Sequence, residues 1–182
     1  MERYHDEEWG FPCVDERSMF ELLSLESFQS GLSWRTILGK REGFRSAFSN
    51  FEPDVVARFD PADVSRLLAD KSIVRNRAKI EATVANAGAI VSLRGSGEAL
   101  AGVVHAHAPV GVTPVPADWP EVPATSPEST ALARDLKGRG FRFLGPTTVY
   151  SFMQACGVVN DHLAWCSTRA AADRARRAAG LP

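Results

Sequence analysis

The stretch "FDPADVSRLLADKSIVRNRAKIEATVANAGAIVSL", residues 59–93, contains two amphipathic helical patterns separated by a short break. Asp60 and Pro61 supply an N-cap and a first-turn proline for the first helix. In the second, apolar residues recur at helical spacing from Ile80 onward. Because the break "KSI" is short, the two helices are expected to pack as a hairpin. The sequence therefore predicts a helix-hairpin-helix over about residues 62–90.

The hairpin carries residues suited to contacts with a nucleic-acid backbone. In this motif the tight turn and the following helix N-terminus direct backbone N–H groups at a DNA phosphate. Arg75 and Lys79 share one face of the second helix, from which they can reach neighbouring phosphates. Together with Lys71 and Ser72 of the turn, they are predicted to bind DNA. Such turns usually contain glycine, so a solvated charged face after an ordinary helix–helix turn is the alternative.

The rest of the chain also has helical periodicity, and no strand pattern is visible. Ser18 and Ser33 are the expected caps of two helices. The proline-rich segment 107–127 is predicted to be a long ordered loop. The basic, alanine-rich last dozen residues are expected to form an exposed helix or a frayed tail. Further helices, each opened by a cap or a first-turn proline, are predicted over residues 18–28, 34–48, 127–138 and 146–157. The prediction is a single all-α domain spanning residues 1–182.

Composition restricts the class of protein. The chain has 182 residues, of which 45% are apolar and 24% charged, as in ordinary globular proteins. No apolar run approaches ~20 residues, so no membrane span is predicted, and the acidic start "MERYHDEEWG" is not a secretory signal. Three scattered cysteines favour a reducing cytoplasm over a disulfide framework. With a net charge of −1, any nucleic-acid binding needs a local basic patch.

A carboxylate in apolar surroundings is the first candidate for chemistry. Glu26 lies in "LSLESFQSGLSW", residues 23–34, between large apolar side chains. Burying a carboxylate is costly unless it has a partner or a task. An exposed position on an amphipathic helix is the simpler alternative for a single Glu. Tyr4, Trp9 and Trp34 are aromatics that can stack on a base, although isolated aromatics more often belong to the core.

A His and a Cys in "VVNDHLAWC", residues 158–166, raise the question of a metal site. On a helix, His162 and Cys166 would project from the same face, one turn apart. A structural zinc site needs four N or S donors. The other candidate donors, between which spacing alone does not choose, are His5, Cys13, His105, His107 and Cys156.

Taken together, these segments resemble the DNA-3-methyladenine glycosylase I family. The matching stretches run in order through nearly the whole chain. The combination of "GLSW" with "YSFMQACG" and "VNDH" is highly specific. The matching stretches include "YHDEEWG" (4–10), "LESFQSGLSWRTILGKREGFRSAF" (25–48), "IVRNRAKIEATVANA" (73–87) and "GRGFRFLGPTTVYSFMQACGVVNDHLAWC" (138–166).

The resemblance implies a monofunctional base-excision enzyme of the helix-hairpin-helix superfamily. Such an enzyme flips 3-methyladenine out of alkylated double-stranded DNA and hydrolyses its N-glycosidic bond. The family is monomeric. Its N- and C-terminal ends are joined near a structural zinc ion held by two His and two Cys.

His5, His162 and Cys166 match three of the family's zinc ligands. The fourth is a Cys about a dozen residues before the first His, whereas this sequence begins four residues before His5. Cys13 lies on the other side of His5 and could serve only after rearrangement. The expectation is either that the fourth ligand lies upstream of the sequence given, or that the site is degenerate with three protein ligands.

The resemblance also assigns pocket residues. Glu26 matches the family's base-recognition glutamate, while Tyr4 and Trp34 match aromatics of the same pocket. Leu32, in the turn before Trp34, is expected to insert into the base stack. Ser27 replaces a Gly that the family generally has beside the glutamate, which could crowd the pocket floor and weaken activity.

Two other readings stay open from the sequence. A catalytically weakened paralogue would bind alkylated lesions without releasing a base. A second enzyme reading has another substrate, such as 3-methylguanine. No Lys stands at the Glu26 position, so neither a Schiff base nor strand cleavage is expected.

Overall fold

The computed structural model describes residues 1–111 and 113–181, and the regular elements in that part of the chain are all helices. The all-α prediction is therefore confirmed for those residues, while Val112 and Pro182 lie outside them. None of the described helices has the length and apolar character needed to cross a bilayer. In chain order they are α1 Glu2–Glu7, α2 Glu16–Gln29, α3 Trp34–Gly39, α4 Arg41–Ala47, η1 Ser49–Phe51, α5 Pro53–Val56, α6 Pro61–Ala69, α7 Arg77–Gly95, α8 Leu100–His105, η2 Trp119–Glu121, α9 Pro127–Gly138, α10 Pro146–Ala155 and α11 Arg169–Ala178.

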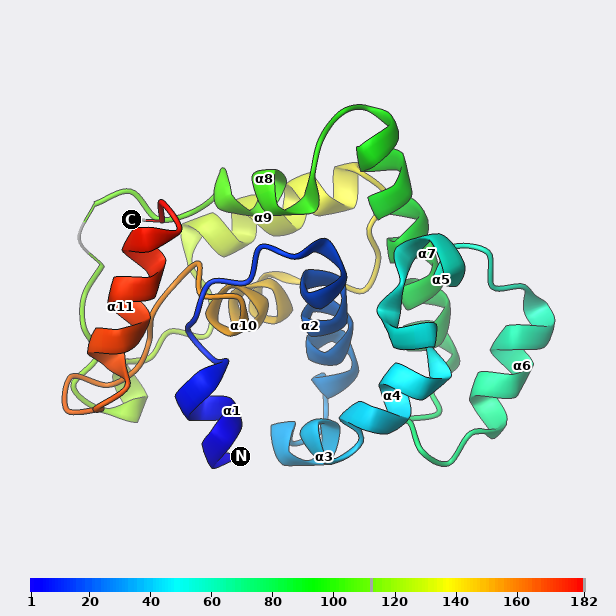
Figure 1. The fold of residues 1–182 in the computed structure, drawn as a ribbon, viewed down its shortest axis with the longest axis horizontal. Helices are drawn as coiled ribbons and strands as arrows, with labels where there is room; N and C mark the ends of the chain where they lie inside the picture. The colour runs from blue at the N-terminus through cyan, green and yellow to red at the C-terminus, as the bar shows by residue number, and fades with distance from the viewer. Residues whose placement is uncertain (112, 182) are drawn as a thin grey trace.

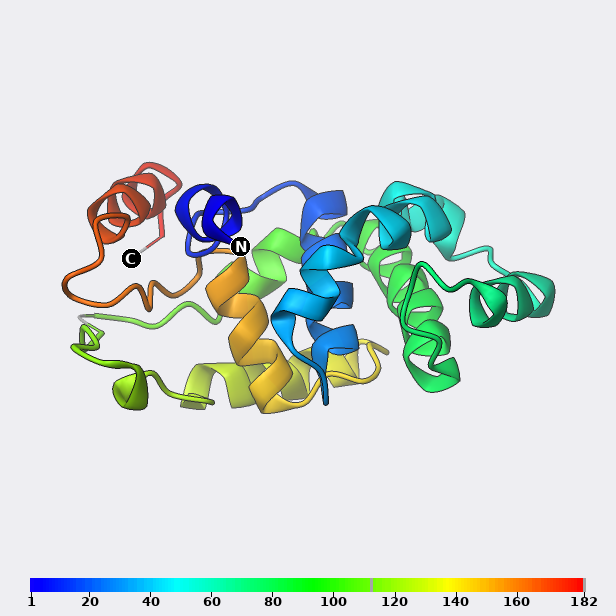
Figure 2. The ribbon, with the colours of Figure 1, turned by 90° about the horizontal axis from the view of Figure 1, so that it is seen from below.

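Helix α2 lies in the middle of the molecule and joins two groups of helices. It packs against α10 and α8 on one side and against α3, η1 and α7 on the other. In Figure 1 the helices α4–α7 lie to one side of α2, and α8–α11 together with α1 lie to the other. The view from below, Figure 2, shows the same division and places α1 beside α11. The two ends of the chain therefore meet on one side of the central helix.

An aromatic cluster anchors α2 to the α4–η1 segment. Phe28 of α2 packs on Phe44 with ring centroids 4.6 Å apart, and Phe48 stacks on Phe51 at 5.6 Å. All four rings are fully buried. Each such side chain contributes roughly 2–3 kcal/mol when removed from water. This packing fixes the C-terminal half of α2, which carries Glu26.

The helix boundaries correct two predictions. Asp15, not Ser18, caps α2, because its carboxylate accepts hydrogen bonds from both the amide (2.9 Å) and the hydroxyl (2.7 Å) of Ser18. The helix predicted over residues 34–48 is two helices, α3 and α4, which meet at Lys40 outside helical geometry. Ser33 caps α3 as predicted, since its hydroxyl accepts from the Thr36 amide.

Helices α6 and α7 follow one another in the chain, but residues 70–76 join them, a longer connection than the predicted three-residue break. Because α7 begins at Arg77, Arg75 precedes the helix on which it was predicted to lie. Asp60 opens α6 with a capping box in which its carboxylate accepts from the amides of Ala62 and Asp63. Asn76 caps α7 by accepting from the Lys79 amide at 3.2 Å. These caps define where each helix begins and hence which residues face outward from the connection.

The segment after α1 crosses the C-terminal end of α10. The Gly10 amide donates to the Gln154 carbonyl at 3.0 Å, and the Cys13 amide donates to the Cys156 carbonyl at 3.1 Å. Gly157 adopts φ +71°, and a Cβ there would lie 2.4 Å from the carbonyl carbon of Phe11. Only glycine allows this approach, which holds α1 against α10.

The C-terminal segment forms a helix, one of the two expected alternatives, but one face of that helix is buried. Arg176 of α11 is only 7% exposed, and its guanidinium donates to the carbonyls of Gly157 and Val158 at 2.9 and 3.0 Å. Ala172 is fully buried. These contacts hold α11 against residues 157–158, whereas Ala170, Ala178 and Ala179 of the alanine-rich segment are exposed.

Candidate functional site

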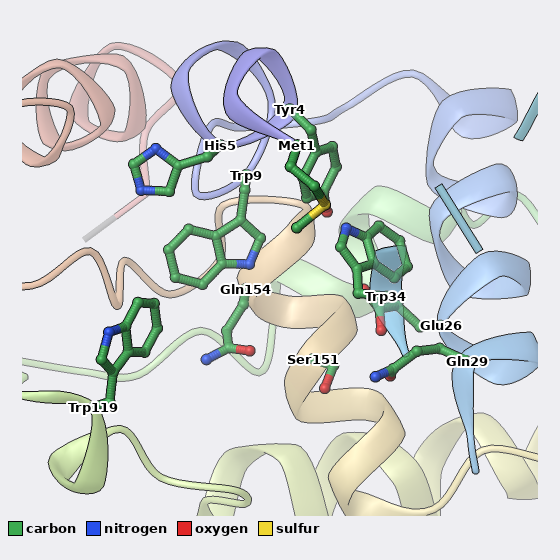
Figure 3. A pocket seen from close by; sticks show the side chains of 10 residues that line it. All are labelled: Met1, Tyr4, His5, Trp9, Glu26, Gln29, Trp34, Trp119, Ser151 and Gln154. Atoms are coloured by element: carbon green, nitrogen blue, oxygen red, sulfur yellow. The ribbon is translucent and has the colours of Figure 1, made fainter. Parts of the chain in front are cut away.

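A cavity of about 340 Å³ lies where α1, α2, α3 and α10 meet (Figure 3). Its volume is within the range typical of small-ligand sites. The side chains that line it come from both ends of the chain, and the crossing of the N-terminal segment over α10 brings them together. Those used below are Tyr4, Trp9, Glu26, Trp34, Ser151 and Gln154.

Glu26 presents a buried carboxylate to this cavity. The residue is 6% exposed, and burial alone raises the pKa of its side chain to about 8. Removal from water disfavours the charged form, and no charge or hydrogen bond in the described chain compensates for it. A carboxylate held at such a cost without a partner is suited to a cationic or hydrogen-bond-donating ligand. The alternative of an exposed Glu on an amphipathic helix is wrong.

Ser27, expected to crowd the pocket, is turned away from it. Its hydroxyl donates to the Leu23 carbonyl at 3.0 Å, one turn back along α2. Ser27 is 2% exposed and is not among the residues that line the cavity. Having serine in place of glycine at this position therefore leaves the pocket floor clear.

Two aromatic side chains form a corner of the cavity beside Glu26. The rings of Tyr4 and Trp34 lie 5.1 Å apart between centroids at an interplanar angle of 46°. Within residues 1–111 and 113–181, the Tyr4 hydroxyl and Trp34 Nε1 are buried and have no hydrogen-bond partner. Burial also raises the pKa of Tyr4, so its hydroxyl stays protonated. Buried donors of this kind are uncommon, and both border the space where a ligand would bind.

Gln154 adds an oriented hydrogen-bond acceptor, which the sequence did not single out. Its Nε2 donates to Asp161 Oδ2 at 2.8 Å, and the Tyr150 hydroxyl donates to the same oxygen at 2.7 Å. Because a carboxylate only accepts, the amide nitrogen must face Asp161. The amide oxygen is left on the cavity side (Figure 3). The "YSFMQACG" motif contains Gln154, but its role depends on Asp161, seven residues further on.

Three predicted metal ligands converge beside the cavity. Cys166 Sγ lies 3.7 Å from His5 Nε2 and 3.5 Å from His162 Nδ1. Donor atoms around a tetrahedral zinc ion are about 3.3–3.8 Å apart, so the two separations from Cys166 fit such an ion, and all three donor atoms lie within 4.8 Å of one another. Among the described residues, the group has these three side chains. Cys13 is not part of it, in keeping with the expectation that it would need rearrangement.

The hydrogen bonds of the two imidazoles orient their lone pairs toward this group. His5 Nδ1 lies 2.7 Å from the Asp6 carboxylate, and His162 Nε2 lies 2.9 Å from the Trp9 carbonyl. Because both partners accept only, these ring nitrogens carry the protons. His5 Nε2 and His162 Nδ1 are then free to coordinate, as in protein zinc sites where a second group fixes the tautomer. The donor set therefore fits zinc.

The backbone that presents His162 and Cys166 corrects the helical prediction. Residues 158–168 form turns and irregular structure, and the Cys166 amide donates to the Leu163 carbonyl at 2.9 Å. Asn160 stabilises this path, because its side-chain oxygen accepts from the His162 amide. The two ligands face each other across a turn instead of along a helix.

Leu32 lies in the turn between α2 and α3, residues 30–33, and is 41% exposed. This 30–33 turn lines a second cavity of about 590 Å³ with Thr147 and Thr148 of α10. The two cavities share Glu26, Gln29 and Ser151, so they adjoin. An apolar side chain thus projects beside the entrance to the Glu26 cavity.

The hairpin residues have different environments. Lys71, Ser72 and Arg75 are exposed, as predicted. The Ser72 amide is already bonded to the Asp70 carboxylate at 2.8 Å. Lys79 is only 5% exposed, and its ammonium donates to two backbone carbonyls, so the expected surface shared with Arg75 is wrong.

Comparison with known proteins gives concordant results. The sequence model of the family described as methyladenine glycosylase matches residues 1–170. The chain is 45% identical to DNA-3-methyladenine glycosylase 1 of Escherichia coli over 166 residues, which is 90% of this chain and 88% of that protein. It is 43% identical to DNA-3-methyladenine glycosylase of Haemophilus influenzae, covering 90% of this chain and 89% of that one.

Solved structures agree with the sequence relatives. The crystal structure of a 3-methyladenine DNA glycosylase I has a TM-score of 0.87 at 44% identity and covers 91% of both chains. A variant of such an enzyme in complex with 3-methyladenine also has a TM-score of 0.87, at 35% identity, covering 92% of this chain and 90% of that one.

Proposed function

This chain belongs to the methyladenine glycosylase family, and we propose that it excises 3-methyladenine from alkylated DNA by hydrolysing the N-glycosidic bond. The observation that carries the proposal is the buried, unpartnered Glu26 carboxylate, which faces the same cavity as Tyr4 and Trp34. Such a cavity suits a flat cation with donor groups on its edge. Mass spectrometry of the bases released from methylated DNA tests it.

The chemistry of the lesion explains what the cavity supplies. Methylation at N3 leaves the adenine cationic, so the C1′–N9 bond is weakened. When it breaks, its electron pair passes to the base and neutralises the positive charge, and water adds to C1′ with loss of a proton to solvent. The aromatic face of Trp34 favours a cationic base over a neutral one. An ionised Glu26 attracts the positive charge of the bound base and of the developing sugar cation.

The polar groups of the cavity favour adenine over guanine. Gln154 presents an amide oxygen, and Glu26 in its ionised form presents two carboxylate oxygens. The amino group of adenine donates to such acceptors, whereas guanine has an oxygen at the same ring position. This pattern supports 3-methyladenine over the 3-methylguanine reading.

Lys79, whose ammonium lies against the turn that follows Glu26, is unsuited to covalent catalysis. A Schiff base needs a free amine that reaches the sugar. The Lys79 ammonium is buried and donates to the carbonyls of Phe28 and Ser30. We therefore infer base excision without strand cleavage.

We also propose that α6, residues 70–76 and α7 act as a helix-hairpin-helix that holds the DNA backbone. The exposed Arg75, with Lys71 and Ser72 of the turn, supports this role. Leu32 is the residue proposed to fill the space left in the base stack, because it is apolar, partly exposed and close to the cavity entrance.

Replacing Arg75 with Met is expected to weaken binding to all duplex sequences alike. Loss of one phosphate contact releases one counterion fewer, so the slope of log affinity against log salt should flatten by about one. Fluorescence anisotropy at several salt concentrations measures this. The matched control is Arg134→Met, at an exposed position on α9, which should keep the parent slope. An unchanged slope for Arg75→Met would place the backbone contact elsewhere.

A structural zinc ion held by His5, His162 and Cys166 is the third part of the proposal, and the donor spacings and imidazole tautomers support it. Such an ion supplies no reaction chemistry here. Its ligands come from α1 and from the segment before α11, so it would hold Tyr4 in position by tying the two ends of the chain together. A water molecule or a further residue would complete the four ligands.

Replacing Cys166 with Ser is expected to remove the metal and lower the melting temperature. Because binding free energy at a structural site stabilises the fold, the decrease should be at least about 5 °C. Elemental analysis and thermal unfolding measure the two effects. Cys13→Ser is the matched control and should keep both the metal and the melting temperature of the parent. Retention of zinc by Cys166→Ser would exclude this site.

Two further expectations accompany this function. Cys13, Cys156 and Cys166 of the described chain form no disulfide, which is consistent with a reducing compartment, so we infer that the protein acts in the cytoplasm. The family resemblance implies a monomer, which analytical ultracentrifugation tests.

A further inference from the structure

Lys79 connects the first turn of α7 to the end of α2. Its Nζ donates to the Phe28 carbonyl at 2.8 Å and to the Ser30 carbonyl at 2.6 Å, and the side chain is almost fully buried. The last carbonyls of a helix have no partner within the helix, and they attract a positive charge. The ammonium therefore satisfies both the end of α2 and the start of the 30–33 turn.

The 30–33 turn has little other support. The Leu32 amide donates to the Gln29 carbonyl at 2.6 Å. Gly31 adopts φ +82°, and no atom lies within 4 Å of where its Cβ would be. The turn is thus open on the side of Gly31. Lys79, which belongs to α7, holds the backbone of this turn through its hydrogen bonds to Phe28 and Ser30.

The other side of Lys79 is equally constrained. The Phe143 ring covers the ammonium at 5.6 Å from its centroid. Phe143 has φ +61°, an unfavourable conformation for an aromatic residue. Asn86 of α7 holds the backbone beside it, exchanging two hydrogen bonds with Arg142 at 2.7 and 3.2 Å. Two segments, the end of α2 with the 30–33 turn and residues 142–143, therefore converge on an ammonium group that α7 carries.

We propose that Lys79 is a positioning residue for base extrusion: it fixes the 30–33 turn, and with it Leu32, at a set separation from the DNA-contacting residues 70–76, which directly precede α7. This proposal rests on the proposed function, since it assumes that Leu32 enters the base stack. Arg75 lies four residues before Lys79, in the connection that leads into α7. The contact with the DNA backbone and the inserted side chain are then coupled through a single side chain.

The proposal separates extrusion from bond cleavage. An apolar side chain at position 79 would leave two carbonyls without their donor, and the turn would shift. In a duplex, the cost of unstacking and unpairing must be met by Leu32. In a single strand that cost is small, and the Glu26 cavity, which Lys79 does not line, acts on the base directly.

The test compares Lys79→Met with the parent on methylated duplex DNA and on the same DNA after strand separation. Single-turnover rates at saturating enzyme remove differences in binding. The variant is expected to lose at least about tenfold on the duplex and less than about threefold on single strands. Equal losses on both substrates would overturn the proposal, because a general structural defect affects both alike.

A double-mutant cycle with Leu32→Ala identifies the route of the effect. If Lys79 acts through Leu32, then Lys79→Met causes little further loss on the duplex once Leu32 is truncated. Independent, multiplying losses would contradict the proposal. Thermal unfolding checks the fold, and Lys79→Gln, which keeps one donor group, replaces the Met variant if that variant does not fold. Failure of the parent to release any base would instead refute the proposed function.

Discussion

Glu26→Gln is expected to release 3-methyladenine at least about 100-fold more slowly than the parent while still binding DNA. The substitution keeps the size of the side chain but removes the negative charge that stabilises a cationic base and sugar, and losses of this size follow removal of such groups. Single-turnover release from methylated DNA measures the rate, and binding to a duplex with an abasic site is the control. Excision at the parental rate would remove Glu26 from the mechanism.

The same carboxylate predicts the pH dependence of the reaction. Burial raises the pKa of Glu26 to about 8 in the free protein, and only the ionised form attracts the cation. Because kcat/KM reports groups of the free enzyme, it should rise with pH up to about 8 and then level off. The Glu26→Gln variant should lack this rise. A parental profile that is flat from pH 6 to pH 9 would contradict the role of this ionisation.

Glu26→Gln should lower the activity but raise the free energy of unfolding, so a stability measurement shows that the loss of activity is not a loss of folding. The folded protein holds a proton on Glu26 that the unfolded chain loses above about pH 4.5, so the parent loses stability as pH rises from 4.5 toward 8. This pKa change corresponds to about 5 kcal/mol at most. Because Glu26 borders an open cavity, water reduces this cost. We therefore expect the free energy of unfolding of Glu26→Gln to exceed that of the parent by about 2 kcal/mol at pH 8 and by progressively less toward pH 4.5. Denaturant unfolding at both pH values measures it.

Trp34→Ala is expected to weaken binding of free 3-methyladenine by about 10–100-fold. Stacking of a base on an aromatic ring contributes about 1–3 kcal/mol, and Trp34 forms a wall of the cavity beside Tyr4. Isothermal titration calorimetry with the free base measures this loss. It bypasses DNA binding and extrusion, so it reports on the cavity alone.

Trp165→Ala is the matched control for that prediction. Trp165 is 73% exposed and does not line the cavity, so its removal should leave the affinity within about twofold of the parent. If Trp34→Ala bound the base as tightly as the parent, the base would have to occupy a different part of the protein.

Some parts of the fold and site could be predicted from local sequence. Asp60 with Pro61 marks the start of a helix by a mechanism confined to four residues, and the structure has the expected cap. That cap depends on residues adjacent in the chain, which a sequence displays directly. The apolar neighbours of Glu26 made it a candidate but left an exposed position as the simpler alternative; the family resemblance assigned it to the pocket, and it is buried.

Other parts depend on contacts between distant segments. Arg75 and Lys79 look equivalent along the predicted helix, but the end of α2, about fifty residues earlier, covers Lys79 and leaves Arg75 exposed. His162 and Cys166 have helical spacing, yet the hydrogen bond from the His162 amide to Asn160 favours a turn. The acceptor role of Gln154 likewise depends on Asp161. Side-chain environment at these positions follows from the tertiary fold, not from spacing.

The most direct test of the function is to incubate this protein and its Glu26→Gln variant with methylated DNA and to identify the released bases by mass spectrometry. We predict free 3-methyladenine from the parent, little 3-methylguanine and almost no base from the variant. Release of 3-methylguanine as the main product would contradict the acceptor pattern of the cavity. No release by the parent, with binding to alkylated DNA intact, would contradict the enzyme and favour a lesion-binding paralogue.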